Sequence, residues 1–187
     1  MEILGTERYI RERLDISPIS KERLDKMFTR LYFPKTREEL IYTIDRLIDE
    51  QGYECNLNVI DVSAITDMNG VFFNSKFNGD ISMWDVSNVT NMFAMFRNSK
   101  FNGDISKWNV GKVEDMCVMF AGSDFNGDIS DWDVRNVRRA TRMFEYSRFD
   151  GDLSKWELLN ATNTRGMFGY SPLLNKRDKH PRKPNNI

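Results

Sequence analysis

The residues best placed to do chemistry are four aspartates that recur at an interval of 24 positions, each directly after a glycine: Asp80, Asp104, Asp128 and Asp152. Carboxylates stacked in one column repel one another unless something compensates their charge. Two compensations are open, namely a calcium ion, or hydrogen bonds from backbone N–H groups in each aspartate's own turn. Turn capping is favoured, because calcium takes about six oxygen ligands or more and each turn shares only one carboxylate. We therefore predict no metal and no cofactor.

Other residue types that commonly carry catalysis are scarce in this chain. The one histidine, His180, lies in a segment rich in proline, lysine and arginine. The two cysteines, Cys55 and Cys117, lack the CxxC spacing of redox or metal motifs. Asp131 and Asp133 form a carboxylate pair, but as outward positions of a strand they offer neither a cleft nor a general acid. The sequence therefore predicts a protein that is not an enzyme.

A cluster of arginines sets one stretch of the chain apart: Arg135, Arg138, Arg139 and Arg142. Guanidinium groups offer paired donors for a carboxylate or a phosphate. Two interpretations stay open at this point. The arginines form a solvated surface paired with nearby acidic residues, or they contact a partner.

The elements that must position these residues are repeats of 24 residues. The repeated aromatic positions are Trp84, Trp108, Trp132, Trp156, Phe77, Phe101, Phe125 and Phe149. The units span 53–76, 77–100, 101–124, 125–148 and 149–172, and the first is degenerate. Because the aromatic residues repeat in register with aliphatic ones, we predict that they stack as a structural core rather than as a ligand platform.

Within one unit, the residue pattern changes its period. Alternation over 84–86 predicts a short strand, and the spacing of Val89, Met92 and Phe96 predicts a short helix. Five such coils would stack into an α/β solenoid with a short parallel sheet, wound in a right-handed sense.

The segments that flank the repeats differ from them. Residues 1–52 predict an N-terminal helical cap, with one helix between a capping box at Thr36 and a stop at Gly52. Further helices are expected near 6–14 and 20–32. Residues 173–187 are predicted to be a basic, flexible tail.

Composition excludes several protein classes. The chain has 187 residues, a formal net charge of -1 and 40% hydrophobic residues, so it can bury a core. No apolar run has the length of a membrane span. The first residues lack the basic-then-apolar pattern of a signal peptide, so we expect a cytoplasmic location.

The repeated string F-N-G-D-I-S-x-W-D-V-S-N-V-T-N-M-x-x-M-F resembles the repeat of BspA-type leucine-rich-repeat surface proteins. That repeat is also found as a domain of unknown function in mycoplasma lipoproteins. The resemblance covers about residues 34–172 and includes the lead-in from Pro34 to Leu40. It implies a leucine-rich-repeat-like solenoid that serves adhesion or protein binding, and it carries over no catalytic residue.

Columns that vary between units are where a solenoid usually recognises a partner, because packing fixes the core columns. The outward strand positions supply the candidates Lys107, Asp131, Asp85, Asn109, Asp133 and Glu157, beside the four arginines above. We expect a monomeric, non-catalytic module that binds a partner protein. The alternative is a regulator or inhibitor of nucleic-acid machinery, of phage or mobile-element type, that uses the arginine-rich third repeat and the basic tail.

Overall fold

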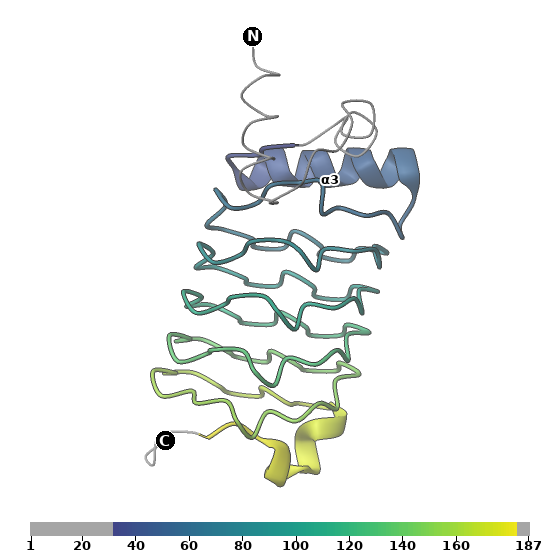
Figure 1. Ribbon diagram of the computed structural model, residues 1–187. Coiled ribbons are helices and arrows are strands. Elements are labelled where there is room, and N and C mark those ends of the chain that lie inside the picture. The colour runs from purple at the N-terminus through teal and green to yellow at the C-terminus, as the bar shows by residue number, and fades with distance from the viewer. Residues whose placement is uncertain (1–31, 183–187) are drawn as a thin grey trace, which may run out of the picture. The chain divides into compact units, whose positions relative to one another are not determined.

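The computed structural model describes residues 32–182, which form a stack of coils with a helix at each end (Figure 1). Helix α3 (Arg37–Gln51) covers the first coil, and two short 3-10 helices, η1 (Pro172–Asn175) and η2 (Arg177–Lys179), follow the last one. The helices expected near 6–14 and 20–32 lie outside the described residues, apart from Tyr32. Within the described range, no helix has both the length and the apolar character needed to cross a membrane.

Helix α3 begins and ends where the capping residues predict. The Thr36 side chain accepts a hydrogen bond from the backbone N–H of Glu39 at 3.2 Å, and Gly52 follows the last turn with a φ of 90°. Glu39 reaches back to the backbone N–H of Lys35 at 2.6 Å, one residue before the position that a capping box uses. The buried side chains of α3, which include Leu40 and Leu47, join the core of the first coil.

Stacked aromatic columns fill the core, as the 24-residue period predicts. Phe77 and Phe101 lie with their ring centroids 6.1 Å apart and their planes within 3° of parallel. Trp84 and Trp108 repeat that arrangement at 6.3 Å, and both indoles are almost fully buried. Each tryptophan also donates its indole N–H to a backbone carbonyl of the coil before, as Trp108 does to Ile81 at 3.1 Å. The columns therefore fix the coils to one another by burial and by hydrogen bonds.

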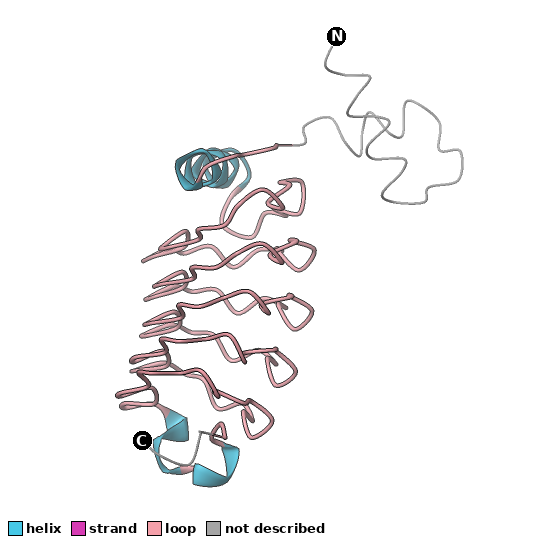
Figure 2. Cartoon of the chain, turned by 90° about the vertical axis from the view of Figure 1, so that its left-hand side faces the viewer, coloured by secondary structure: helices cyan, strands magenta, loops and turns pink. Residues whose placement is uncertain are grey.

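The expected strand and helix within each coil are wrong. Between α3 and η1 the described chain contains only turns and isolated parallel bridges, and Figure 2 shows loops throughout the stack. Four of the seven bridges within residues 32–182 run through the column of Asn91, inside the segment where a helix was expected. The backbone N–H of Met92 donates to Asp115 of the next coil at 2.8 Å, while that of Met95 donates to Met92 within its own coil.

The reason is that each coil is built from turns, three of which are opened by an Asx residue. Asp80, Asp85 and Asn91 each accept, through a side-chain oxygen, the N–H of the residue two positions later. A turn closed by a backbone hydrogen bond between residues three apart follows each one, over 81–84, 86–89 and 92–95. Apolar residues therefore recur at intervals of three and four residues without any helix.

Two columns of left-handed residues complete this turn pattern. They contain one residue each from five successive units, all with φ between 50° and 66°: Gly70, Ala94, Val118, Arg142 and Gly166, then Asn74, Asn98, Gly122, Tyr146 and Tyr170. Only three of the ten are glycine, so the sequence conceals the requirement. Side chains in this conformation carry strain, which is greatest for a β-branched residue such as Val118.

Residues after the last coil pack against it rather than extending freely, up to Arg182. Leu173 is fully buried, and the His180 ring lies 4.4 Å from that of Phe168. Lys176 contacts both carboxylate oxygens of Asp150 at 2.6 Å, and Arg182 forms a parallel bridge with Glu157. The expectation of a flexible tail from 173 onward therefore does not describe 173–182, because these residues cover the open end of the core.

Candidate partner-binding surface

The aspartates after each repeated glycine cap their own turns. Asp80, Asp104, Asp128 and Asp152 each accept the backbone N–H of the serine two residues later, at 2.8 to 2.9 Å. That backbone N–H is the main reason why the pKa of each carboxyl lies below its usual value. No group of three or more potential ligands that could hold a metal occurs within residues 32–182. These hydrogen bonds account for the charged column by turn capping, the second of the two compensations.

The outward columns predicted for partner binding are partly engaged within the chain. Asp85, Asn109 and Asp133 are turn caps of the same kind. Asp131 pairs with Lys155 of the next unit at 2.8 Å, and both side chains are exposed. Lys107 and Glu157 are exposed as well. The outward columns thus combine side chains that cap turns with side chains that are exposed.

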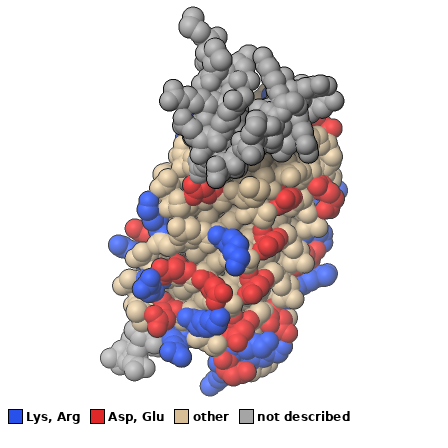
Figure 3. Space-filling view, viewed as in Figure 1, with Lys and Arg blue, Asp and Glu red and all other residues tan. Residues whose placement is uncertain are grey.

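The arginine cluster is divided among four separate ion pairs. Arg135 holds Asp133 with a two-pronged contact at 2.8 and 2.9 Å, which lowers the pKa of that carboxyl. The other three arginines each face a different acid: Arg138 faces Glu114 at 3.6 Å, Arg139 faces Asp115 at 2.7 Å, and Arg142 faces Glu145 at 3.6 Å. On the face seen in Figure 3, basic and acidic side chains are interspersed in the same way.

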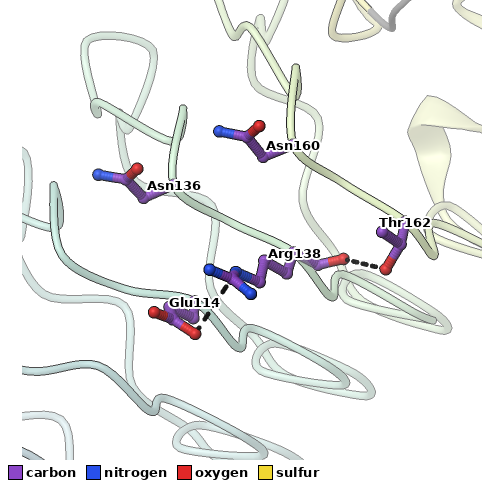
Figure 4. Close-up of a pocket in the computed structure, with 5 residues that line it drawn as sticks. All are labelled: Glu114, Asn136, Arg138, Asn160 and Thr162. Atoms are coloured by element: carbon purple, nitrogen blue, oxygen red, sulfur yellow. Dashed lines mark hydrogen bonds and ion pairs between the residues drawn. The ribbon is translucent and has the colours of Figure 1, made fainter.

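A groove of about 300 Å³ brings one of these arginines together with residues that the sequence analysis did not single out. It is lined by Glu114, Asn136, Arg138, Asn160 and Thr162, which come from three successive units. Figure 4 shows the carboxamides of Asn136 and Asn160 projecting side by side from neighbouring coils, with the Arg138–Glu114 pair below them. Each asparagine is held in place because its side-chain N–H donates to a backbone carbonyl of the preceding coil.

A signal for this groove was present in the repeat. The residue before the buried Val89 column reads Asn88, Lys112, Asn136 and Asn160, so an amide recurs in three of the four units. A second feature that sequence reasoning missed is the exposed pair Tyr146 and Tyr170, whose rings stack 4.5 Å apart. Both tyrosines occupy a left-handed column, which no residue pattern in the sequence indicates.

The thiols of the two cysteines are less acidic than usual. Both are free, and they belong to different columns of the repeat. Burial raises the pKa of Cys55 and of Cys117, so each thiol holds its proton more tightly than an ordinary cysteine.

Comparison with known proteins agrees with the repeat. No curated protein and no solved structure matches the chain significantly. A family model described as "Mycoplasma protein of unknown function, DUF285" matches residues 44–148 and, in a second register, 66–180. The two matches overlap along the stacked coils and cover more than half of the chain, and they confirm the resemblance stated from the repeated string. The chain therefore belongs to the DUF285 family of repeat proteins.

Proposed function

We propose that the chain is a non-catalytic module that binds a partner protein through the exposed, variable columns of its solenoid. The observation that carries the proposal is the contrast between buried and exposed columns. The column of Trp84 keeps one residue type in four units and is buried in all of them. One column of the groove instead reads Thr90, Glu114, Arg138 and Thr162, and all four are exposed.

The groove is the part of this surface best suited to a partner. Its lining combines a carboxylate, a guanidinium and two carboxamides, each with a contact to a neighbouring coil. Side chains that are already ordered lose little conformational entropy when a partner binds. The proposal includes three predictions from the sequence. They are a right-handed, leucine-rich-repeat-like winding, a monomeric state and a cytoplasmic location.

The ion pairs weigh against the nucleic-acid alternative. Each arginine of the third full repeat faces a carboxylate, including Arg148, which lies 3.0 Å from Asp124. A phosphate would therefore have to displace an acidic side chain at every contact. Such competition disfavours a surface built on phosphate neutralisation.

The experiment that tests the proposal compares two charge reversals in affinity capture from a native lysate. Arg138→Glu changes the groove, whereas Arg97→Glu makes the same change at an exposed arginine outside it. We expect one stoichiometric protein to be captured by the parent chain and by Arg97→Glu, and to be lost with Arg138→Glu. Mass spectrometry after nuclease treatment reads the result.

Two outcomes would overturn the proposal. Equal capture by both variants would exclude the groove as the binding surface. Capture that disappears with nuclease, or that falls steeply with salt, would favour the nucleic-acid alternative, since each phosphate contact adds about -0.9 to the log-log salt slope on duplex DNA.

A further inference from the structure

The groove contains two hydrogen-bond acceptors that nothing in the described chain uses. Asn136 and Asn160 direct their side-chain N–H groups to Gly111 and Arg135, at 2.6 and 2.8 Å. Neither side-chain oxygen accepts a hydrogen bond from any of residues 32–182. Both side chains are exposed and line the groove, so the two oxygens face solvent at its rim (Figure 4).

The same column shows, two units earlier, what such an oxygen binds. Asn88 donates to the backbone of Ser63 in the same manner, at 2.9 Å. Its oxygen accepts the ammonium group of Lys112, the residue 24 positions later, at 2.8 Å. The residue 24 positions after Asn136 is Asn160 rather than a lysine, so the oxygen of Asn136 receives no ammonium group from that column.

A carboxylate in the groove can also meet a cation. The lining carries one carboxylate, on Glu114, and one guanidinium group, on Arg138. Asp133 binds Arg135 tightly, whereas Glu114 lies 3.6 Å from Arg138 and keeps an exposed side chain. Because charge-assisted hydrogen bonds are among the strongest, an ammonium group that meets both a carboxamide oxygen and a carboxylate is well held.

We propose that the groove binds a basic segment of the partner protein, with a lysine ammonium group seated on the side-chain oxygens of Asn136 and Asn160. This inference rests on the proposed function and names the chemistry of the partner. Lys112 on Asn88 is the internal model of the contact. A lysine supplies three donors on a long flexible stem, which suits two acceptors from neighbouring coils.

The chain offers a variant that fills the site from within. Asn160 follows Asn136 by 24 residues, as Lys112 follows Asn88. In Asn160→Lys, the new ammonium group therefore reaches the oxygen of Asn136 and occupies the proposed site. The repeat already carries lysine at this position in one unit, so the substitution is compatible with the fold. Lys112→Ala is the matched opposite change, because it frees the oxygen of Asn88.

The test titrates the full chain with a synthetic, end-blocked peptide that has three lysines separated by glycines. NMR spectra of the chain record the binding. The side-chain NH₂ signals of Asn136 and Asn160 should shift with the lysine peptide, while that of Asn88 stays fixed. Asn160→Lys should weaken binding by about tenfold or more, the usual size for one charge-assisted hydrogen bond. Lys112→Ala should make the Asn88 signal respond as well. Peptides carrying acetyl-lysine or glutamate in place of lysine serve as controls.

Three results would overturn the inference: equal shifts with lysine and acetyl-lysine peptides, unchanged binding by Asn160→Lys, or shifts confined to residues outside the groove. The backbone spectrum of each variant reports whether it is folded. Capture of a protein partner that depends on Arg138, without any response to lysine peptides, would leave the proposed function standing and remove only this inference.

Discussion

At the scale of single residues, the turns that build each coil depend on two kinds of position. One is an Asx side chain that accepts the N–H two residues later, as Asp80 does from Ser82. The other is a residue in the left-handed region, such as Ala94 or Val118. The first kind recurs visibly in the sequence. The second is occupied by six residue types and is visible only in the backbone.

Val118→Gly should stabilise the protein by about 1 kcal/mol. Valine at φ 50° carries the strain of a β-branched side chain in the left-handed region, whereas glycine adopts that conformation freely. The half-buried side chain offsets part of this gain. Urea denaturation measures the difference, and Val118→Ala is the control, because alanine retains most of the backbone strain. If the glycine variant were no more stable than the alanine variant, strain at this position would be negligible.

At the scale of elements, the sequence predicted the structure at the N-terminal end of the stack but not at the C-terminal end. Helix α3 was predicted with its boundaries, because Thr36 and Gly52 are strong local signals for the two ends of a helix. The packing of 173–182 was not predicted. Its contacts join residues about 26 positions apart, such as Lys176 and Asp150, and no local pattern encodes them.

Within the coils, the sequence predicted elements that the structure does not contain. The aromatic core follows from the period alone, but the strand over 84–86 and the helix after it do not exist. Successive four-residue turns bury side chains at the same intervals as a helix does, so hydrophobic spacing cannot separate the two. The groove was missed for a related reason. Asn136 and Asn160 lie 24 residues apart, and only stacking of the coils brings them together.

Asp150→Asn should loosen the C-terminal segment in a way that depends on pH. Lys176 is the main reason why the pKa of Asp150 lies below its usual value. A carboxyl with a lowered folded pKa stabilises the protein above its unfolded pKa, and that contribution fades as the pH falls through the folded value. The variant should therefore be less stable than the parent at neutral pH and equal to it in strong acid.

Urea denaturation at several pH values measures this difference. Asparagine is the residue that the first three full units carry at this position, as in Asn126, so the substitution suits the coil itself. A stability difference that stays constant from neutral to strongly acidic pH would contradict a role for the carboxylate charge.

At the scale of the whole described unit, neighbouring coils are joined by hydrogen bonds that repeat with the period. Trp108 donates to Ile81, and Trp132 donates to Ile105, with the same offset of 27 residues. Stability in such arrays is close to a sum of unit and interface contributions.

Deletion of 101–124 should therefore give a folded protein that melts at a lower temperature. The deletion joins Lys100 to Phe125 and brings Trp132 over Trp84 in the original register, where its indole N–H reaches Ile81. Deletion of 101–112, half a unit, is the control and should prevent folding, because it sets core columns against exposed ones. Thermal melting followed by tryptophan fluorescence checks both. Equal behaviour of the two deletions would mean that register does not govern the stack.

The parallel indoles have a consequence for how this molecule can be observed. Trp84 and Trp108, and again Trp132 and Trp156, lie 6.3 Å apart with their planes within 9° of parallel. Chromophores at such spacing couple excitonically, so stacking changes how strongly the indoles absorb ultraviolet light. The far-ultraviolet helix band of residues 32–182 arises mainly from α3, which lies outside the repeats. Unfolding of the coils is therefore measured by tryptophan absorption, while the helix band of the circular dichroism spectrum reports the unfolding of α3.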